Sequence, residues 1–395
     1  MPRNLWFIVI GMVINVTGSS FLWPLNTIYL HDHLGKSLSI AGLVLMVNAF
    51  ATVIGNLIGG FLFDKIGGYR SIVVGAVITL SALIGLTINH GWPQYVVWMI
   101  IIGFGSGLIF PAMYAMAGSV WKEGGRKAFN AVYVAQNLGV AVGSALGGLI
   151  ASFSFDYIFA ANMIMYVIFL LLVLLTYKNI ESDPQVNASA ILQQPVKSNR
   201  MLYALLVLCT GYLLCWVGYV QWTATISAYT QEIGVTLRQY SLLWTINGAL
   251  IVLGQPFVNK LISIFMKKVK LQMIVGMIIF MGSFAIAAFA TNFSGFLTAM
   301  LILTIGEMLV WPAVPTIASE LSPKGKEGFY QGIVNSTATA GRMIGPLLGG
   351  LLVDFYGMQM MFFVLMILFV VAIGTTLLYD KLLSRTRTEK VAVAE

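Results

Sequence analysis

The stretch GFLFDKIGGYR, residues 60–70, separates two apolar segments that are each long enough to cross a membrane as a helix. Such a crossing takes about 20 apolar residues. Gly60 permits the close approach of two helices, and Gly67 with the glycine after it allows a tight turn. An acid such as Asp64 at the end of a helix can satisfy the positive N-terminal end of a neighbouring helix. The stretch therefore predicts a short loop between two membrane-spanning helices.

Apolar segments of the same length recur along the whole chain, and charged residues stand almost only in the gaps between them. Nineteen of the 22 Lys and Arg residues fall in alternate gaps, which the positive-inside rule assigns to the cytoplasm. The sequence thus predicts an all-α protein of the cell membrane with twelve transmembrane helices and both termini in the cytoplasm. The spans are expected near 5–29, 38–63, 70–89, 95–120, 129–153, 158–177, 202–230, 238–258, 271–291, 295–320, 328–353 and 360–380.

Composition agrees with a membrane protein, since 59% of the residues are hydrophobic and 9% are charged. A soluble domain has about 25% charged residues. The net charge of +8 is scattered over short cytoplasmic loops, so we attribute it to topology and to contact with anionic lipids rather than to nucleic-acid binding. Cys209 and Cys215 stand in one span without a nearby His or acid, so neither a disulfide nor a metal site is expected there.

The chain divides into two similar halves. Its longest polar stretch, residues 178–200, is interpreted as a cytoplasmic linker between an N-terminal bundle of residues 1–177 and a C-terminal bundle of residues 201–395. Pro111 in the fourth span aligns with Pro312 in the tenth, and GVAVGSALGGLI in the fifth span aligns with GRMIGPLLGGLL in the eleventh. This duplication predicts two pseudo-symmetric six-helix bundles with a substrate site at mid-depth between them.

Residues 60–70 fit the pattern GxxxD(R/K)xGxxR and so resemble the loop signature of the major facilitator superfamily. The arrangement of six spans, a linker and six more spans is similar as well. The resemblance implies a transporter in which Asp64 meets the start of the eleventh span and holds the cytoplasmic gate shut. The gating motif that it implies consists of Gly60, Asp64, Lys65, Gly67 and Arg70.

A second motif resembles the GxxxGPxxGG pattern of antiporters within that superfamily. It implies export of the substrate, while ordinary tight helix packing without bearing on direction is the alternative. We expect these glycines to let backbones touch at the seam between the halves. The residues that carry the motif are Gly139, Gly143, Gly147 and Gly148 in the fifth span, where Ser144 replaces the proline, and Gly341, Gly345 and Pro346 in the eleventh.

Two short segments are similar to the LmrP-like multidrug transporters of this superfamily, namely YVAQNL at residues 133–138 and Gly306-Glu307-Met308 with Pro312. Two positions depart from that pattern. Met99 stands where many proton antiporters carry an arginine, and Val132 stands where a further membrane acid is expected. These departures favour simpler proton chemistry with fewer titrating groups.

Glu307 is the one acidic residue that the predicted spans place deep in the hydrocarbon region. A charge there costs about 2.5–3.5 kcal/mol on insertion scales, so it indicates a function. Such a carboxyl can carry a proton, and it can attract a cationic substrate when ionised. Arg342 is expected at the same depth, about 21 Å from the cytoplasmic face at 1.5 Å per residue. We expect Glu307 and Arg342 to form an ion pair that proton or substrate binding can break. One alternative is that Glu307 is a structural carboxyl that stays paired permanently. The other is that Arg342 faces the other half of the protein.

Aromatic, methionine and amide side chains are expected to line the substrate cavity, because flat rings and thioethers suit lipophilic cations of varied shape. For any one of them, contact with lipid or packing in the core is the alternative. The candidates are Asn15, Trp23, Tyr29, Phe110, Met113, Tyr114, Gln136, Asn137, Trp216, Tyr219 and Trp311.

These features predict a monomeric, proton-coupled exporter of lipophilic cationic or neutral small molecules that works by alternating access without a cofactor. A symporter for a sugar, metabolite or peptide and a lipid flippase are alternatives of the same fold. An enzyme is not expected, because the spans hold no convergent cluster of nucleophile, base or metal ligands. The sequence also has no GxxxxGK[ST] loop, so the proton gradient rather than ATP is the expected energy source.

Overall fold

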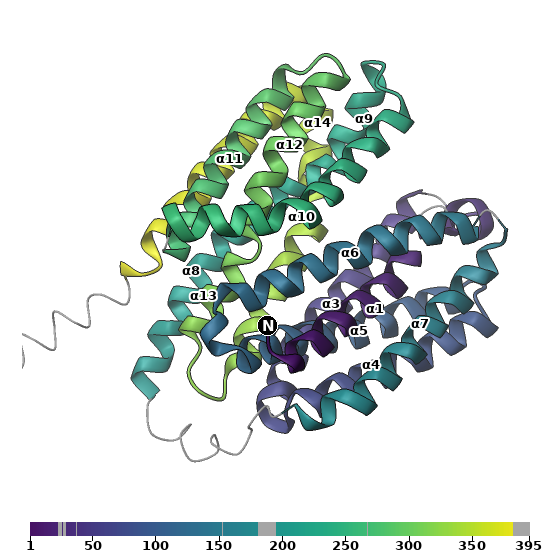
Figure 1. The fold of residues 1–395 in the computed structure, drawn as a ribbon. Coiled ribbons are helices and arrows are strands. Elements are labelled where there is room, and N and C mark those ends of the chain that lie inside the picture. The colour runs from purple at the N-terminus through teal and green to yellow at the C-terminus, as the bar shows by residue number, and fades with distance from the viewer. Residues whose placement is uncertain are drawn as a thin grey trace, which may run out of the picture. The chain divides into compact units, whose positions relative to one another are not determined.

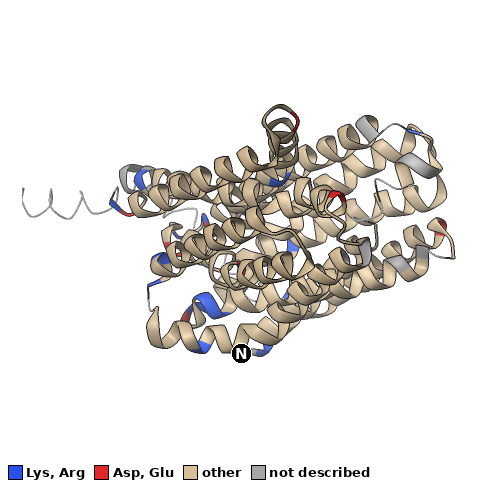
Figure 2. Ribbon diagram, turned by 90° about the horizontal axis from the view of Figure 1, so that it is seen from above, with Lys and Arg blue, Asp and Glu red and all other residues tan. Residues whose placement is uncertain are grey.

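The computed structural model describes residues 1–22, 26, 29–36, 38–151, 153–180, 195–266 and 268–381. Over these ranges the chain forms helices connected by short turns and holds no strand (Figure 1). The predicted all-α fold is therefore confirmed. Charged residues are sparse along the helices, which are mostly tan in Figure 2.

Unit 1 comprises Met1–Ala188 together with Lys324–Thr339. Within it, α1 packs against α6 and α7, and α5 packs against α3 and α4. The α3–α4 turn is made at Gly67, whose φ of 85° favours glycine because it has no Cβ. The long helices are α1 (Arg3–Leu22), α3 (Leu38–Ile66), α4 (Gly68–Ile88), α5 (Gln94–Val120), α6 (Arg126–Ala151) and α7 (Phe155–Thr176), and the short turns are η2 (Tyr29–His33), η3 (Lys122–Gly124) and η4 (Tyr177–Asn179).

Unit 2 comprises Ser189–Pro323 and Ala340–Glu395. Within it, α12 packs against α10 and α11, and α13 packs against α8 and α11. Its elements are α8 (Pro195–Tyr219), η5 (Val220–Trp222), α9 (Thr225–Glu232), α10 (Leu237–Phe265), α11 (Val269–Phe289), α12 (Phe293–Val310), α13 (Ala313–Leu321) and α14 (Glu327–Leu378), whose first turns belong to unit 1.

Ten helices in the described part of the chain are long and apolar enough to cross a membrane. The last of them, α14, contains two spans, because Gly357 interrupts its helical backbone with a φ of 80°. Helix α6 is not among the ten, although it occupies the position of the predicted fifth span. With α6 included and α14 counted as two spans, the helices match the twelve spans that the sequence predicts.

Two boundaries differ from the prediction. The sequence assigned the start of the eleventh span to the C-terminal bundle, whereas the contacts of Lys324–Thr339 group this segment with unit 1. The predicted linker, residues 178–200, extends too far, because α8 already begins at Pro195. Residues 181–194 of that linker lie outside the described residues. The division of the chain into two bundles at the linker stays a prediction.

The glycines of the two antiporter-type motifs serve tight packing inside each unit. In unit 1, a Cβ added at Gly139, Gly143 or Gly147 would collide with α1. In unit 2, a Cβ added at Gly341 or Gly345 would collide with α8 or η5. We expected these glycines to contact the opposite half of the protein. Their nearest atoms instead belong to the first helix of the same half, or to the short turn that follows it. Gly148 lies outside the residues whose surroundings the structure describes.

Replacing Gly143 by Ala is expected to lower the melting temperature of the purified protein. The new Cβ would collide with the carbonyl oxygen of Thr17, and such overpacking costs about 1–3 kcal/mol. Gly248→Ala in α10 is the matched control, because a Cβ there meets nothing within 4 Å. Alanine favours a helix over glycine by about 0.5–1 kcal/mol, so the control should melt at the same or a higher temperature. Equal melting temperatures for the two variants would contradict the packing assigned to Gly143.

Candidate functional site

Glu307 lies at a break in the tenth span. It belongs to the last turn of α12, and its side chain is 2% exposed. The helix ends at Val310, and α13 begins only after Pro312, which has no backbone N–H to continue the ladder. The amide of Trp311 still donates to the carbonyl oxygen of Glu307 at 3.0 Å. The carboxyl thus stands beside an interrupted helix, which is where transporters commonly form substrate and ion sites.

A neutral amide holds the carboxyl of Glu307. Nδ2 of Asn247 in α10 donates to Oε1 of Glu307 at 3.0 Å and to Oγ1 of Thr304 at 2.8 Å. The hydroxyl of Tyr219 is a further hydrogen-bond partner of the carboxyl. An amide N–H can donate to an ionised or to a protonated carboxyl, so the contact with Asn247 is compatible with both states. Asn247 was not predicted from the sequence, where it is one of three amides in the eighth span, with Gln239 and Gln255.

Five rings beside Glu307 form what we call the aromatic wall. Trp216 stacks on Trp311 with ring centroids 4.4 Å apart and an interplanar angle of 10°. Tyr219 meets both indoles edge-on at 5.4 Å. Tyr212 and Phe280 pack against Trp311 at 5.6 and 5.4 Å. The structure therefore brings together the predicted cavity residues Trp216, Tyr219 and Trp311 in unit 2, and it adds Tyr212 and Phe280, which the sequence analysis did not select.

Arg342 borders the aromatic wall from α14. Its guanidinium carbon lies 4.9 Å from the ring centroid of Trp216, within the range of a cation–π contact. The residue is exposed. The charges of Arg342 and Glu307 both act on Tyr219, so the two side chains share one electrostatic environment. Whether they alternate between pairing and release stays a prediction.

Several predicted cavity residues lie in the interior of unit 1 instead. Asn15 is 1% exposed, Tyr29 is 3% exposed and Met113 is fully buried. Asn15 lies on the helix face of Gly11 and Gly18, whose nearest neighbours belong to α7 and η4, so it packs inside the bundle. All three are core positions of unit 1 in this structure, and a role for them in a substrate cavity stays a prediction. Trp23 lies outside the described residues.

The remaining candidates in unit 1 lie near one another on α5 and α6. The hydroxyl of Tyr114 donates to Oε1 of Gln136 at 3.0 Å, and Nδ2 of Asn137 donates to the carbonyl oxygen of Tyr133 at 2.9 Å. Phe110 is partly buried against the core of unit 1. These side chains provide polar and aromatic surface but no charge.

The structure gives Asp64 a defined partner in unit 1. Its Oδ1 accepts a hydrogen bond from the amide of Gly328 at 2.7 Å, and its Oδ2 accepts from the amide of Phe329 at 2.8 Å. Both amides belong to the first turn of α14, where N–H groups have no partner within the helix. Glycines at 60 and 328 let the two backbones approach, because a Cβ on either would collide with the other's carbonyl group. The carboxylate thus caps α14.

Other residues of the predicted gating motif do not share this contact. Nζ of Lys65 lies 5.9 Å from the ring centroid of Phe61, and Arg70 is exposed. Farther along α14, the hydroxyl of Ser336 donates to the carbonyl oxygen of Val53 at 3.2 Å. The contact between α3 and the start of α14 therefore extends beyond the capping carboxylate.

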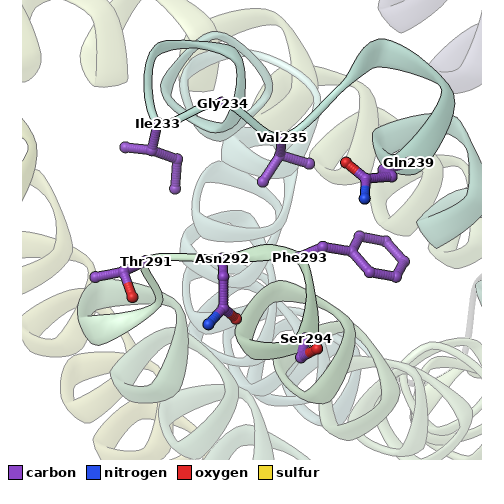
Figure 3. Close-up of a pocket in the computed structure, with 8 residues that line it drawn as sticks. All are labelled: Ile233, Gly234, Val235, Gln239, Thr291, Asn292, Phe293 and Ser294. Atoms are coloured by element: carbon purple, nitrogen blue, oxygen red, sulfur yellow. The ribbon is translucent and has the colours of Figure 1, made fainter.

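A pocket of about 470 Å³ opens at the turns before α10 and α12, as Figure 3 shows. Two of its polar side chains cap helices: the side chain of Asn292 accepts from the amide of Gly295 at 3.0 Å, and that of Gln239 accepts from the amide of Thr236 at 2.9 Å. The described residues of its lining include no charged one, so these residues offer less chemistry than the Glu307 site. The lining residues are Ile233, Gly234, Val235, Gln239, Thr291, Asn292, Phe293 and Ser294.

Comparison with known proteins identifies the family. The family model described as Major Facilitator Superfamily matches residues 8–229 and again residues 215–394. The MFS-type transporter YttB of Bacillus subtilis (strain 168) is 60% identical over 381 residues, which are 96% of each protein. The multidrug resistance protein MdtH of Aeromonas salmonicida (strain A449) is 23% identical over 359 residues, 90% of this chain and 88% of that protein.

A solved structure agrees with these sequence matches at the level of the fold. The human organic anion transporter MFSD10 (TETRAN) has a TM-score of 0.76 and 13% identity, and the match covers 95% of this chain and 100% of that one. With helices that match the twelve predicted spans, a loop signature at residues 60–70 and a family model that matches both halves, the chain belongs to the Major Facilitator Superfamily.

Proposed function

We propose that this transporter exports lipophilic cationic or neutral small molecules in exchange for protons, with both of its termini in the cytoplasm. The observation that carries the proposal is the buried carboxyl of Glu307, which Asn247 and Tyr219 hold beside the aromatic wall. A multidrug resistance protein among the relatives supports it.

Exchange follows from competition at one carboxyl. An ionised Glu307 attracts a cation, and the neighbouring rings stabilise that cation by cation–π contacts and dispersion. Protonation removes the negative charge and so weakens the binding of the cation. The substrate binds while Glu307 is ionised and leaves when Glu307 is protonated. The carboxyl therefore carries either the substrate or the proton across the membrane, but not both at once. No cofactor is needed for this cycle, and a single chain contains all of its groups.

Alternating access requires a contact that stabilises one state of the cytoplasmic gate. The two hydrogen bonds from α14 to Asp64 supply such a contact, because they form only while the start of α14 lies against α3. We propose that the gating motif around Asp64 has this role here.

Vesicles that contain the purified protein test the function. Tetraphenylphosphonium is a suitable probe, because its permanent charge prevents passive trapping of a weak base on the acidic side. With an acidic interior, we expect it to accumulate inside. If one proton exchanges for one cation, the ratio is about tenfold for each pH unit, since one unit corresponds to about 1.36 kcal/mol. Empty vesicles are the control, and uptake of a sugar together with protons would overturn the proposal.

A further inference from the structure

Three buried side chains of unit 2, those of Thr304, Asn247 and Glu307, belong to one directed chain of hydrogen bonds. The hydroxyl of Thr304 donates to the carbonyl oxygen of Met300 at 2.7 Å. Nδ2 of Asn247 in turn donates to Oγ1 of Thr304 and to Oε1 of Glu307. Thr304 and Glu307 are three residues apart on α12, so a single amide from the neighbouring α10 reaches both.

The first bond of this chain fixes the orientation of the amide. A threonine hydroxyl has one proton, and Met300 accepts it, so Oγ1 of Thr304 is an acceptor toward Asn247. Only the NH2 group of the amide can donate, and it therefore faces both Thr304 and Glu307. Turning the amide over would set its oxygen against Oγ1, or would require Thr304 to release Met300. Either change costs a hydrogen bond among buried groups.

This orientation bears on the proton that Glu307 carries. An ionised carboxylate only accepts hydrogen bonds, whereas a protonated carboxyl also has a proton to donate. A donor that is held against the carboxyl favours the ionised form, because a charge-assisted hydrogen bond is about twice as strong as a neutral one. An amide that could turn over would instead offer its oxygen to the protonated form.

Building on the proposed function, we propose that Thr304 is a positioning residue for proton coupling. It holds Asn247 with the donor toward Glu307 and thereby favours the ionised carboxyl over the protonated one. Release of the proton is promoted in this way, and the carboxylate is then ready to bind the next cation.

Other ionisable groups also act at this site. Tyr219 on α8 is a further hydrogen-bond partner of Glu307, and the charges of Tyr240 on α10 and Arg342 on α14 act on Tyr219. A substitution at Thr304 leaves all of these groups in place. A difference between variants at this position therefore reports the amide and the hydroxyl that orients it.

Infrared difference spectroscopy on the purified protein tests the proposal. A protonated carboxyl has a C=O stretching band that a carboxylate lacks, and the part of this band that Glu307→Gln removes belongs to Glu307. Its amplitude against pH gives the midpoint of proton uptake. Thr304→Val retains the shape of the side chain without the hydroxyl, so the amide can turn over when Glu307 is protonated. The midpoint should rise by about 0.5–1 pH unit, which is about threefold to tenfold in proton affinity and corresponds to one hydrogen bond.

Two further substitutions separate this role from a structural one. Thr304→Ser retains the hydroxyl and should restore the wild-type midpoint. Thr316→Val is the matched control, because Thr316 in α13 is also buried and its hydroxyl also donates to a backbone carbonyl four residues earlier, that of Pro312 at 2.6 Å. This control removes the same kind of hydrogen bond and should leave the midpoint unchanged.

An unchanged midpoint in Thr304→Val would overturn the proposal, and so would an equal rise in Thr304→Ser or Thr316→Val. If Thr304→Val does not fold, Asn247→Leu takes its place. Loss of the donor itself should raise the midpoint by about 1–2 pH units, as for a hydrogen bond to a charged group, and an unchanged midpoint would again refute the role of Thr304.

The spectroscopic titration needs no substrate, so it separates this proposal from the proposed function. If tetraphenylphosphonium accumulates in the vesicles but the midpoint does not shift, proton exchange stands and only the role of Thr304 has failed. If the midpoint shifts as expected but no accumulation occurs, the role of Thr304 in orienting the amide stands and the proposed exchange has failed. A wild-type band that does not respond to pH would overturn both.

Discussion

Glu307→Gln is expected to abolish proton-driven accumulation, so that the concentration ratio of tetraphenylphosphonium falls from about ten per pH unit to one. Glutamine has nearly the same shape and can still accept the hydrogen bond from Asn247, so the local fold should persist. It cannot release or bind a proton in this pH range, and it bears no charge to attract a cation. The measurement is the vesicle ratio with an acidic interior.

Glu320→Gln is the matched control for this prediction. Glu320 belongs to α13, the second part of the same span, and is exposed. Its replacement should leave the ratio near the wild-type value. If Glu307→Gln retains the full dependence on the pH gradient while Glu320→Gln loses it, Glu307 is not the coupling residue.

Asp64→Asn is expected to loosen the start of α14 from α3. Asparagine keeps one oxygen to accept a hydrogen bond but loses the second acceptor and the negative charge beside the helix N-terminus. A hydrogen bond to a charged group contributes about 1.5–3 kcal/mol. A loss of about 2 kcal/mol corresponds to about 30-fold in the ratio of free to docked α14.

Hydrogen–deuterium exchange measures this ratio, because the amides of Gly328 and Phe329 have their bond partner in Asp64. Peptides covering the start of α14 should exchange about 30-fold faster in the variant when exchange follows the open population. Asp380→Asn is the control, since Asp380 forms a partly exposed ion pair with Lys270 in unit 2, and such pairs contribute about 0–1 kcal/mol. Unchanged protection in Asp64→Asn would remove the basis for the gating role.

The sequence predicted the fold because the membrane imposes its rules locally. Consecutive residues alone determine the length of an apolar segment, the charge of a loop and the motif at residues 60–70. Each of these features could therefore be interpreted without the tertiary structure. Glu307 was predicted for the same reason, since a lone acid in an apolar segment is unusual in any arrangement of helices.

The sequence could not predict side-chain positions that depend on how each helix is rotated about its own axis. Nothing in the sequence shows that Asn247 faces Glu307, or that Asn15 turns into its own bundle rather than toward a cavity. A buried amide between helices and an amide at a cavity give the same pattern along the chain. The glycines gave a similar ambiguity: their spacing indicates a close neighbour but does not say which helix it is.

The glycines on α6 and α14 allow the same close helix packing in both halves, yet Glu307 and Arg342 have no ionisable counterparts in the first half. At the positions that the repeat aligns with Glu307 and Arg342, the first half carries Ser106 and Val140. Under the proposed function, the group that couples transport to protons therefore lies in the second half alone. Substitutions in the first half are then expected to alter the compounds that are transported without removing the coupling group.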